Sequence, residues 1–240
     1  MTTVAASLQR VPGFESTAYA VAQGQIVWTG SDAVTDHPRN LHSPWQPPLQ
    51  RWDATRLQAG AQICLDLFAR EDSQRLAPKG LMLWLVGQPL PFPLQLAVAR
   101  FGAIRTALHR RDLPAFEAAA CRVLGLGHGL TPSGDDFVGG ILFALEHAPL
   151  AAWVDPLPAV KIRIRVAAAD ATNPISAALL EDLMAGASYR ALHDLLAALS
   201  SQNAMDIEAA VAQLLRVGAS SGADMLAGVL LALGTARTTH

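Results

Sequence analysis

The sequence predicts an α+β protein in which a β-rich N-terminal region, residues 1–93, precedes a helical region, residues 94–240. Short apolar runs bounded by turn residues are frequent in the first region, which is typical of strands. Alanine- and leucine-rich segments with helix start signals dominate the second region. Strands followed by helices in separate parts of a chain indicate an α+β architecture.

The N-terminal region contains one predicted β-hairpin and two further predicted strands. Segments 17–22 and 26–29 flank Gln23-Gly24-Gln25, which predicts the hairpin. The apolar runs 61–68 and 81–86 have the length of buried strands. Residues 37–50 contain four prolines and are expected to form a long loop, which either faces a partner or packs on its own tryptophans.

The stretch 80–99 carries no charge and is long enough to cross a membrane as a helix. Three prolines interrupt it, so we expect a strand, a turn and a helix start instead. No signal peptide is expected at the N-terminus. Cys64 and Cys121 lack the spacing of a metal site or a redox motif and are expected to be reduced. The sequence thus predicts a soluble, cytoplasmic protein.

The C-terminal region is predicted to contain eight helices. Asp112 before Pro114, and Asn173 before Pro174, are typical helix starts, as is Ser133 before two aspartates. Thr172-Asn173-Pro174 is interpreted as such a start, with a contact to the functional site as the alternative. The expected ranges are 94–110, 114–124, 134–147, 158–170, 174–186, 189–200, 206–216 and 222–236.

Charged residues are sparse, at 16% of the chain against a usual value of roughly 25%. Such a surface favours self-association or a partner chain, so we expect an oligomer. The net charge of -2 gives no basic footprint for nucleic acid. Lys161, Arg163 and Arg165 form the densest basic group. A solvated helix face is the preferred interpretation of this group, and the wall of an anion pocket is the alternative.

Residues 125–136, Gly-Leu-Gly-His-Gly-Leu-Thr-Pro-Ser-Gly-Asp-Asp, are the most informative segment of the chain. Glycine adopts positive φ and lets backbone N–H groups face a common centre. A helix that begins beside the loop adds free N–H groups and the positive end of its dipole. The segment therefore predicts a site for phosphate or carboxylate. Its expected binding residues are Gly127, Gly129, Leu130, Thr131, Ser133 and Gly134.

His128, Asp135 and Asp136 are the candidate catalytic residues of this loop. His128 is a candidate general acid, and mere exposure is the alternative. An aspartate beside an anion would repel it. We therefore expect Asp135 and Asp136 to bind a divalent cation such as Mg2+, or to accept hydrogen bonds from a substrate NH2 group. Alternatively, they only complement the helix dipole.

A second Ser-Gly-x-Asp motif, Ser221-Gly222-Ala223-Asp224, follows the first by 88 residues (221 − 133 = 88). In both copies a glycine, Gly140 or Gly228, comes four residues after the last aspartate. A glycine inside a helix indicates close approach of another backbone. We therefore expect the two helices to cross there and to bring Ser221, Gly222 and Asp224 to the same anion site. The alternative is a duplicated helical hairpin in which each motif only caps its helix.

Segments 125–137 and 217–228, with Thr-Asn-Pro-Ile-Ser at 172–176, resemble a poorly characterised bacterial family. That family includes a subunit of the oxamate carbamoyltransferase of anaerobic allantoin breakdown. The resemblance implies phosphorolysis of an N-carbamoyl compound to carbamoyl phosphate. It also implies phosphate or carbamoyl phosphate and a small carboxylate as ligands, and companion carbamoyltransferase subunits as partners.

Two other classes of function remain open from the residues alone. Glycine loops with serine and aspartate also hold nucleotide phosphates, which is typical of a small-molecule kinase. The loop lacks the lysine of an ordinary phosphate-binding loop. The third class is a non-catalytic assembly subunit whose repeated helices form an interface.

Overall fold

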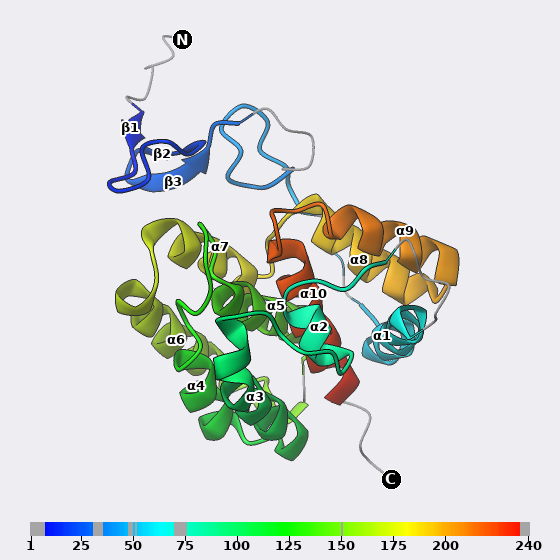
Figure 1. The fold of residues 1–240 in the computed structure, drawn as a ribbon. Helices are drawn as coiled ribbons and strands as arrows, with labels where there is room; N and C mark the ends of the chain where they lie inside the picture. The colour runs from blue at the N-terminus through cyan, green and yellow to red at the C-terminus, as the bar shows by residue number, and fades with distance from the viewer. Residues whose placement is uncertain are drawn as a thin grey trace.

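The structure, a computed structural model, describes residues 8–30, 36–47, 50, 52–69, 76–149 and 151–235. Within these residues a small antiparallel sheet precedes a large helical body, which agrees with the predicted α+β class. Figure 1 shows the sheet to one side of the helices, next to α7. None of the described helices is long and apolar enough to cross a membrane.

The sheet consists of β1 (Gln9–Arg10), β2 (Tyr19–Ala22) and β3 (Gln25–Trp28), in that order. Strands β2 and β3 form the predicted hairpin, in which Tyr19 lies opposite Trp28. The two turn residues, Gln23 and Gly24, have φ angles of 51° and 78°. Positive φ at both positions is typical of the turn that matches the twist of two paired strands.

The two other predicted strands are wrong, because both segments are helical. Residues 61–68 belong to α1 (Ala54–Phe68), and residues 81–86 coincide with α2 (Leu81–Leu85). The side chain of Asp53 caps α1 by accepting from the N–H groups of Thr55 and Arg56. A short apolar run does not distinguish a buried strand from a buried helix. The N-terminal region therefore contains less β structure than predicted.

The eight helices predicted for the C-terminal region are all present, with ends that differ by a few residues. The first begins with a 3₁₀ turn, η2, before α3. A further 3₁₀ turn, η3 (Ala151–Trp153), precedes α6. The elements are η2 (Leu94–Ala97), α3 (Val98–Arg110), α4 (Leu113–Cys121), α5 (Ser133–His147), α6 (Leu157–Ala171), α7 (Pro174–Met184), α8 (Arg190–Ser201), α9 (Ala204–Leu214) and α10 (Ser221–Thr235).

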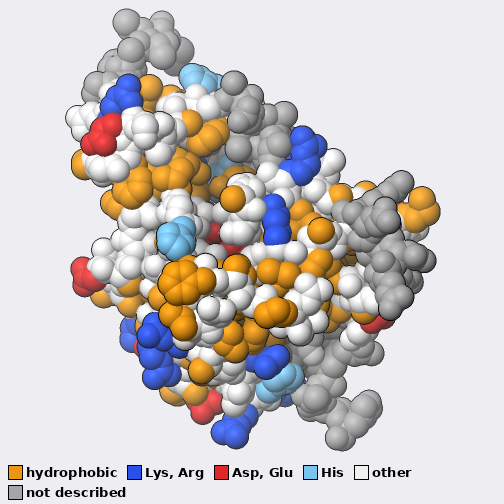
Figure 2. Space-filling model, viewed as in Figure 1, with side chains coloured by type: hydrophobic (Ala, Val, Ile, Leu, Met, Phe, Trp, Pro, Cys, Tyr) orange, Lys and Arg blue, Asp and Glu red, His pale blue; other side chains and the backbone are white. Residues whose placement is uncertain are grey.

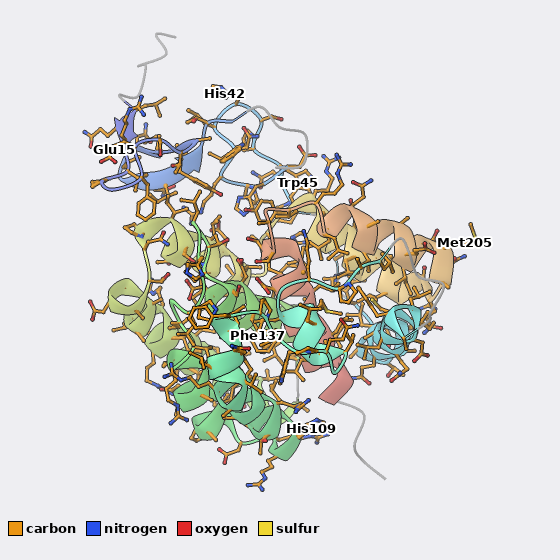
Figure 3. All side chains as sticks on the ribbon, viewed as in Figure 1. Glu15, His42, Trp45, His109, Phe137 and Met205 are labelled. Carbon is orange, nitrogen blue, oxygen red and sulfur yellow. The ribbon has the colours of Figure 1, made fainter. Side chains whose placement is uncertain are left out.

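Helices α5 and α10 form the centre of the helical body (Figure 1). Residues 133–145 of α5 and 222–233 of α10 are all buried. A helix that is apolar on every side is stable only when other elements surround it. Phe137 of α5 lies in the middle of the body in Figure 3, with its ring 5.6 Å from that of Phe101.

The two central helices cross at the predicted glycines. A Cβ atom on Gly140 would lie 2.2 Å from the carbonyl oxygen of Met225, and one on Gly228 would lie 2.2 Å from that of Phe137. Neither distance is possible for a real side chain, so only glycine permits this approach. The crossing brings the N-termini of α5 and α10 together.

The helices two places before α5 and α10 end in the same way. The residue that follows α3 is Arg111 and the one that follows α8 is Gln202, and both have left-handed φ angles, 54° and 61°. The next residues, Asp112 and Asn203, cap α4 and α9 with their side chains. These pairs are 91 residues apart (202 − 111 = 91), three more than the Ser-Gly-x-Asp motifs, because the loop before the first motif is three residues longer.

Arg39 attaches the sheet to α7. Its guanidinium group forms an ion pair with Asp182 and also donates to the carbonyl oxygens of Ile26 and Ala178, at 3.1 Å each. A small apolar cluster adjoins this contact: Ile175 and Leu179 of α7 pack with Val11 near the sheet. Tyr19 of β2 and Leu130 of the glycine loop pack against the same cluster. The sheet therefore packs against both α7 and the glycine loop.

Candidate functional site

The two Ser-Gly-x-Asp motifs meet where α5 and α10 begin. The hydroxyl oxygens of Thr131 and Ser221, which precede or begin these helices, are 2.7 Å apart and share a hydrogen bond. Ser133 is the first residue of α5, and its side chain makes no capping hydrogen bond, because Pro132 occupies the cap position. The expectation that Ser133 caps the helix is therefore wrong.

Each motif supplies a hydroxyl group to the aspartate of the other motif. The hydroxyls of Ser221, in the second motif, and of Thr131 lie close enough to Asp136 of the first motif to lower its pKa. The hydroxyl of Ser133, in the first motif, lies close enough to Asp224 of the second to lower the pKa of that carboxyl. This reciprocal arrangement joins the two helix starts into one polar cluster inside an apolar body.

Burial raises the pKa of both carboxyl groups in this pair. Desolvation, followed by the nearby charge of Asp224, raises the pKa of Asp136 well above its usual value. Desolvation also raises the pKa of Asp224 to about 6. The N–H of Leu81, at 2.6 Å, and the hydroxyls of Ser133 and Ser220 oppose this increase because they stabilise the charged form.

One oxygen of each of these aspartates remains without a well-formed hydrogen bond. Among the described residues, nothing donates to Oδ2 of Asp136 or Oδ2 of Asp224, although both atoms are buried. The two residues are 6% and 0% exposed. A buried acceptor without a donor costs free energy, so these two oxygens are unusual in the core.

Asp135, the neighbouring candidate, is bonded to the protein on both oxygens. The Gly125 N–H donates to Oδ1 at 2.7 Å, and the Ser176 hydroxyl donates to Oδ2 at 2.6 Å. The Thr172 hydroxyl also donates to Oδ2. Asp135 is 1% exposed. It therefore holds the start of the glycine loop against the start of α7.

The Thr172-Asn173 segment thus reaches the site, which was the alternative interpretation of its sequence. Besides the bond from Thr172 to Asp135, the Asn173 amide donates to the carbonyl oxygen of Leu130 at 2.9 Å. The side-chain oxygen Oδ1 of Asn173 meanwhile caps α7 by accepting from the N–H groups of Ile175 and Ser176. One side chain therefore starts a helix and positions the glycine loop.

The glycine loop presents unpaired backbone donors. Within the described part of the chain, the N–H groups of residues 127–131 donate to no protein atom. Gly127 and Gly129 have φ angles of 123° and 101°, which residues with a side chain rarely adopt. His128 between them is exposed. The loop lies beside the positive N-terminal ends of α5 and α10, where an anion is stabilised.

Three residues near the pair were not among the predicted site residues. Tyr189, immediately before α8, and Tyr19 on β2 lie close to each other, and the charge of Asp136 raises the pKa of both phenols. Lys79 places a positive charge near Asp224. Nothing in the local sequence marks these residues, since they come from elements far from both motifs.

Other candidate groups have structural roles. Arg163 and Arg165 form ion pairs with Glu117 and Glu181 on a solvated helix face, whereas the mostly buried Lys161 pairs with Glu146. His193 packs against the rings of Trp45 and Phe143 at 4.9 and 5.0 Å; Figure 3 shows Trp45 beside the helical body. In the part of the chain that the structure describes, no group of three or more histidine, cysteine or acidic side chains could hold a metal ion.

A groove of about 640 Å³ lies elsewhere, between β3 and α7. Its lining includes Arg39 and Asp182, the residues that attach the sheet, and neither of the paired aspartates. The groove therefore belongs to the joint between the sheet and α7 and is separate from the meeting point of the two motifs.

Comparison with known proteins gives one match. Residues 123–233 match the model of the family described as oxamate carbamoyltransferase subunit AllH. No curated protein and no solved structure matches the chain. The matched segment contains the glycine loop, both Ser-Gly-x-Asp motifs and the Thr172-Asn173 segment. It confirms, over residues 123–233, the predicted resemblance to the AllH family.

Proposed function

We propose that this protein is a subunit of a carbamoyl-transferring enzyme and that its glycine loop binds phosphate or the phosphate group of carbamoyl phosphate. The observation that carries the proposal is the run of unpaired N–H groups at residues 127–131, beside the N-termini of α5 and α10. Such donors are suited to an anion. The family match supports a carbamoyl group as the group transferred, because oxamate carbamoyltransferase acts on a carbamoyl compound.

The site residues have separate roles in this proposal. Residues Gly127 to Thr131 supply N–H groups, and the hydroxyls of Thr131 and Ser221 face the polar cluster. Asp135 holds the loop in place, because its oxygens already accept from the protein. Preformed donors of this kind stabilise negative charge that develops during transfer without further rearrangement. His128 is exposed in the loop and is the candidate proton donor.

We further propose that α3–α4–α5 and α8–α9–α10 are two copies of one duplicated unit. The matched left-handed residues, the matched caps and the reciprocal Ser–Asp contacts all support this interpretation. The duplication explains why the site lies between two equivalent helix starts.

The proposal also implies companion carbamoyltransferase subunits. Figure 2 shows hydrophobic side chains over much of the visible face, with charges scattered among them. Several large apolar side chains are exposed, among them Phe92 (74%) and Leu96 (75%). Exposed apolar groups that lie close together are typical of surfaces that contact another chain.

Titration calorimetry of the full chain with phosphate, carbamoyl phosphate and ATP tests the anion site. Replacement of Gly129 by valine should weaken phosphate binding by about tenfold or more, equivalent to about 1.4 kcal/mol. Gly24→Val is the matched control, since both glycines have positive φ with open space around them and Gly24 lies in the distant hairpin turn. Equal phosphate affinity in both variants would refute the loop site. Binding of ATP but not of phosphate would favour the kinase class instead.

A further inference from the structure

We infer that Asp136 and Asp224 together bind the NH2 group of a carbamoyl substituent, with one N–H directed to Oδ2 of each aspartate. The inference rests on the proposed function for the identity of the transferred group. It adds a binding role for Asp224, which belongs to the second motif, and assigns the NH2 group to this pair and not to Asp135.

The two aspartates offer two free hydrogen-bond acceptors. The two Oδ2 atoms accept no well-formed hydrogen bond from the described residues, although the side chains are almost fully buried. A buried polar atom left without a partner costs about 1–3 kcal/mol, and more when it is charged. An NH2 group carries two donors on one nitrogen, so one such group can satisfy both oxygens.

The balance of charge around the pair favours a neutral ligand group. Two carboxylates exclude an anion from this position. The positive ends of two helices and the nearby Lys79 offset part of their negative charge already. The described residues contain no group of three or more histidine, cysteine or acidic side chains that could hold a metal ion, so a divalent cation here would take most of its ligands from water and substrate oxygens. A neutral NH2 donor fits this pair because it supplies the missing hydrogen bonds without adding charge.

The pair lies next to the end of the glycine loop. The hydroxyls of Thr131 and Ser221 both interact with Asp136, and both residues are only half-buried. They hydrogen bond to each other at 2.7 Å in the free protein. The inferred binding mode requires rotation about one side-chain torsion in each residue, which would release these hydroxyls and open a path from the glycine loop to the carboxylates. A carbamoyl phosphate could therefore lie with its phosphate at the loop and its NH2 at the pair.

Binding should be coupled to proton release. An N–H group donates a stronger hydrogen bond to an ionised carboxylate than to a neutral carboxyl group, and burial raises the pKa of both aspartates in the free protein. A ligand that donates to them favours the charged forms, so its affinity should rise between about pH 5 and pH 8. Phosphate at the loop carries negative charge and should show no such increase.

The experiment is titration calorimetry of the full chain with two probes, N-carbamoylglycine and its N,N-dimethyl analogue, which has no N–H on the terminal nitrogen. We expect the first probe to bind and the second to bind at least about tenfold more weakly. Asp136→Asn and Asp224→Asn should each weaken the first probe by a similar factor, because the amide replaces an acceptor with a donor. Asp170→Asn, at an exposed position of α6, is the control and should leave binding unchanged.

Three results would overturn the inference. They are no binding of the carbamoyl probe, equal binding of both probes, and stoichiometric Mn2+ binding that both variants lose. Circular dichroism and thermal unfolding verify that each variant is folded. Phosphate titration separates this inference from the proposed function. If phosphate binds and the carbamoyl probe does not, only the NH2 site fails; if the carbamoyl probe binds and phosphate does not, only the anion loop fails.

Discussion

Gly140 of α5 lies directly against the backbone of Met225 in α10, so close that a Cβ atom would be 2.2 Å from the Met225 carbonyl oxygen. Gly228 of α10 has the equivalent relationship with Phe137 of α5. These two contacts set the distance between the helices and hence the meeting of their N-termini. The polar cluster exists because the helices can approach this closely.

Gly140→Ala and Gly228→Ala should each reduce the free energy of unfolding by about 2 kcal/mol or more, because the added methyl group forces the helices apart. Urea unfolding measures the change. Gly102→Ala is the control, since Gly102 lies in α3 with open space around it. It should stabilise the protein by up to about 1 kcal/mol through helix propensity. A loss of stability at Gly102 equal to that at Gly140 would contradict the crossing.

Asp135→Ala should destabilise the protein by about 3 kcal/mol, because it leaves the Gly125 N–H and the Ser176 hydroxyl without their acceptor. Asp170→Ala, at an exposed position, should stay within about 0.5 kcal/mol of the wild type. Hydrogen exchange should also show weaker protection around residues 125–135 in Asp135→Ala. If the two variants unfold at the same urea concentration, Asp135 does not hold the loop.

Arg39→Ala should loosen the sheet from α7. The variant loses the ion pair with Asp182, in which both side chains are only 17% exposed, together with two bonds to carbonyl oxygens. We expect a loss of about 2 kcal/mol, with faster hydrogen exchange in β2 and β3. Arg165→Ala breaks a pair whose side chains are 56% and 51% exposed. It should change stability by less than about 1 kcal/mol, so similar exchange in both variants would argue against Arg39 as the attachment point.

Asp224→Asn should stabilise the protein at high pH relative to the wild type. The pKa of Asp224 is raised to about 6 in the folded state. Its contribution to stability is therefore fully present below its unfolded pKa, near 3.8, and is lost as pH rises through about 6. Asparagine keeps an acceptor for the Leu81 N–H and remains neutral at every pH. The free energy of unfolding of Asp224→Asn relative to that of the wild type, measured by urea unfolding, should increase from pH 4 to pH 8.

A difference between Asp224→Asn and wild type that stays constant from pH 4 to pH 8 would refute the raised pKa. A variant that is more stable yet binds the carbamoyl probe poorly would show that the aspartate is kept for function at a cost in stability.

Local signals predicted most of the helices and the hairpin. Asp112 and Asn173 cap helices that begin at the next residue, and Gln23-Gly24 forms the turn between β2 and β3. The signals were weakest for short apolar runs. Residues 61–68 were predicted as a strand, although they continue a helix that Asp53 caps eight residues earlier. Tertiary packing decides such cases, because a buried strand and a buried helix segment present the same composition.

The sequence alone determined that two helices begin with Ser-Gly-x-Asp, that each carries a glycine four residues after its aspartate, and that a glycine loop precedes the first. These features depend on neighbours within one or two turns of chain. Only the tertiary structure decided that the hydroxyl of Ser133 lies near Asp224 and that of Ser221 near Asp136, and that Asp135 is committed to Gly125 and Ser176. The physical reason is that a carboxylate's role depends on which donors and charges surround it in the folded core, and those residues lie far away along the chain.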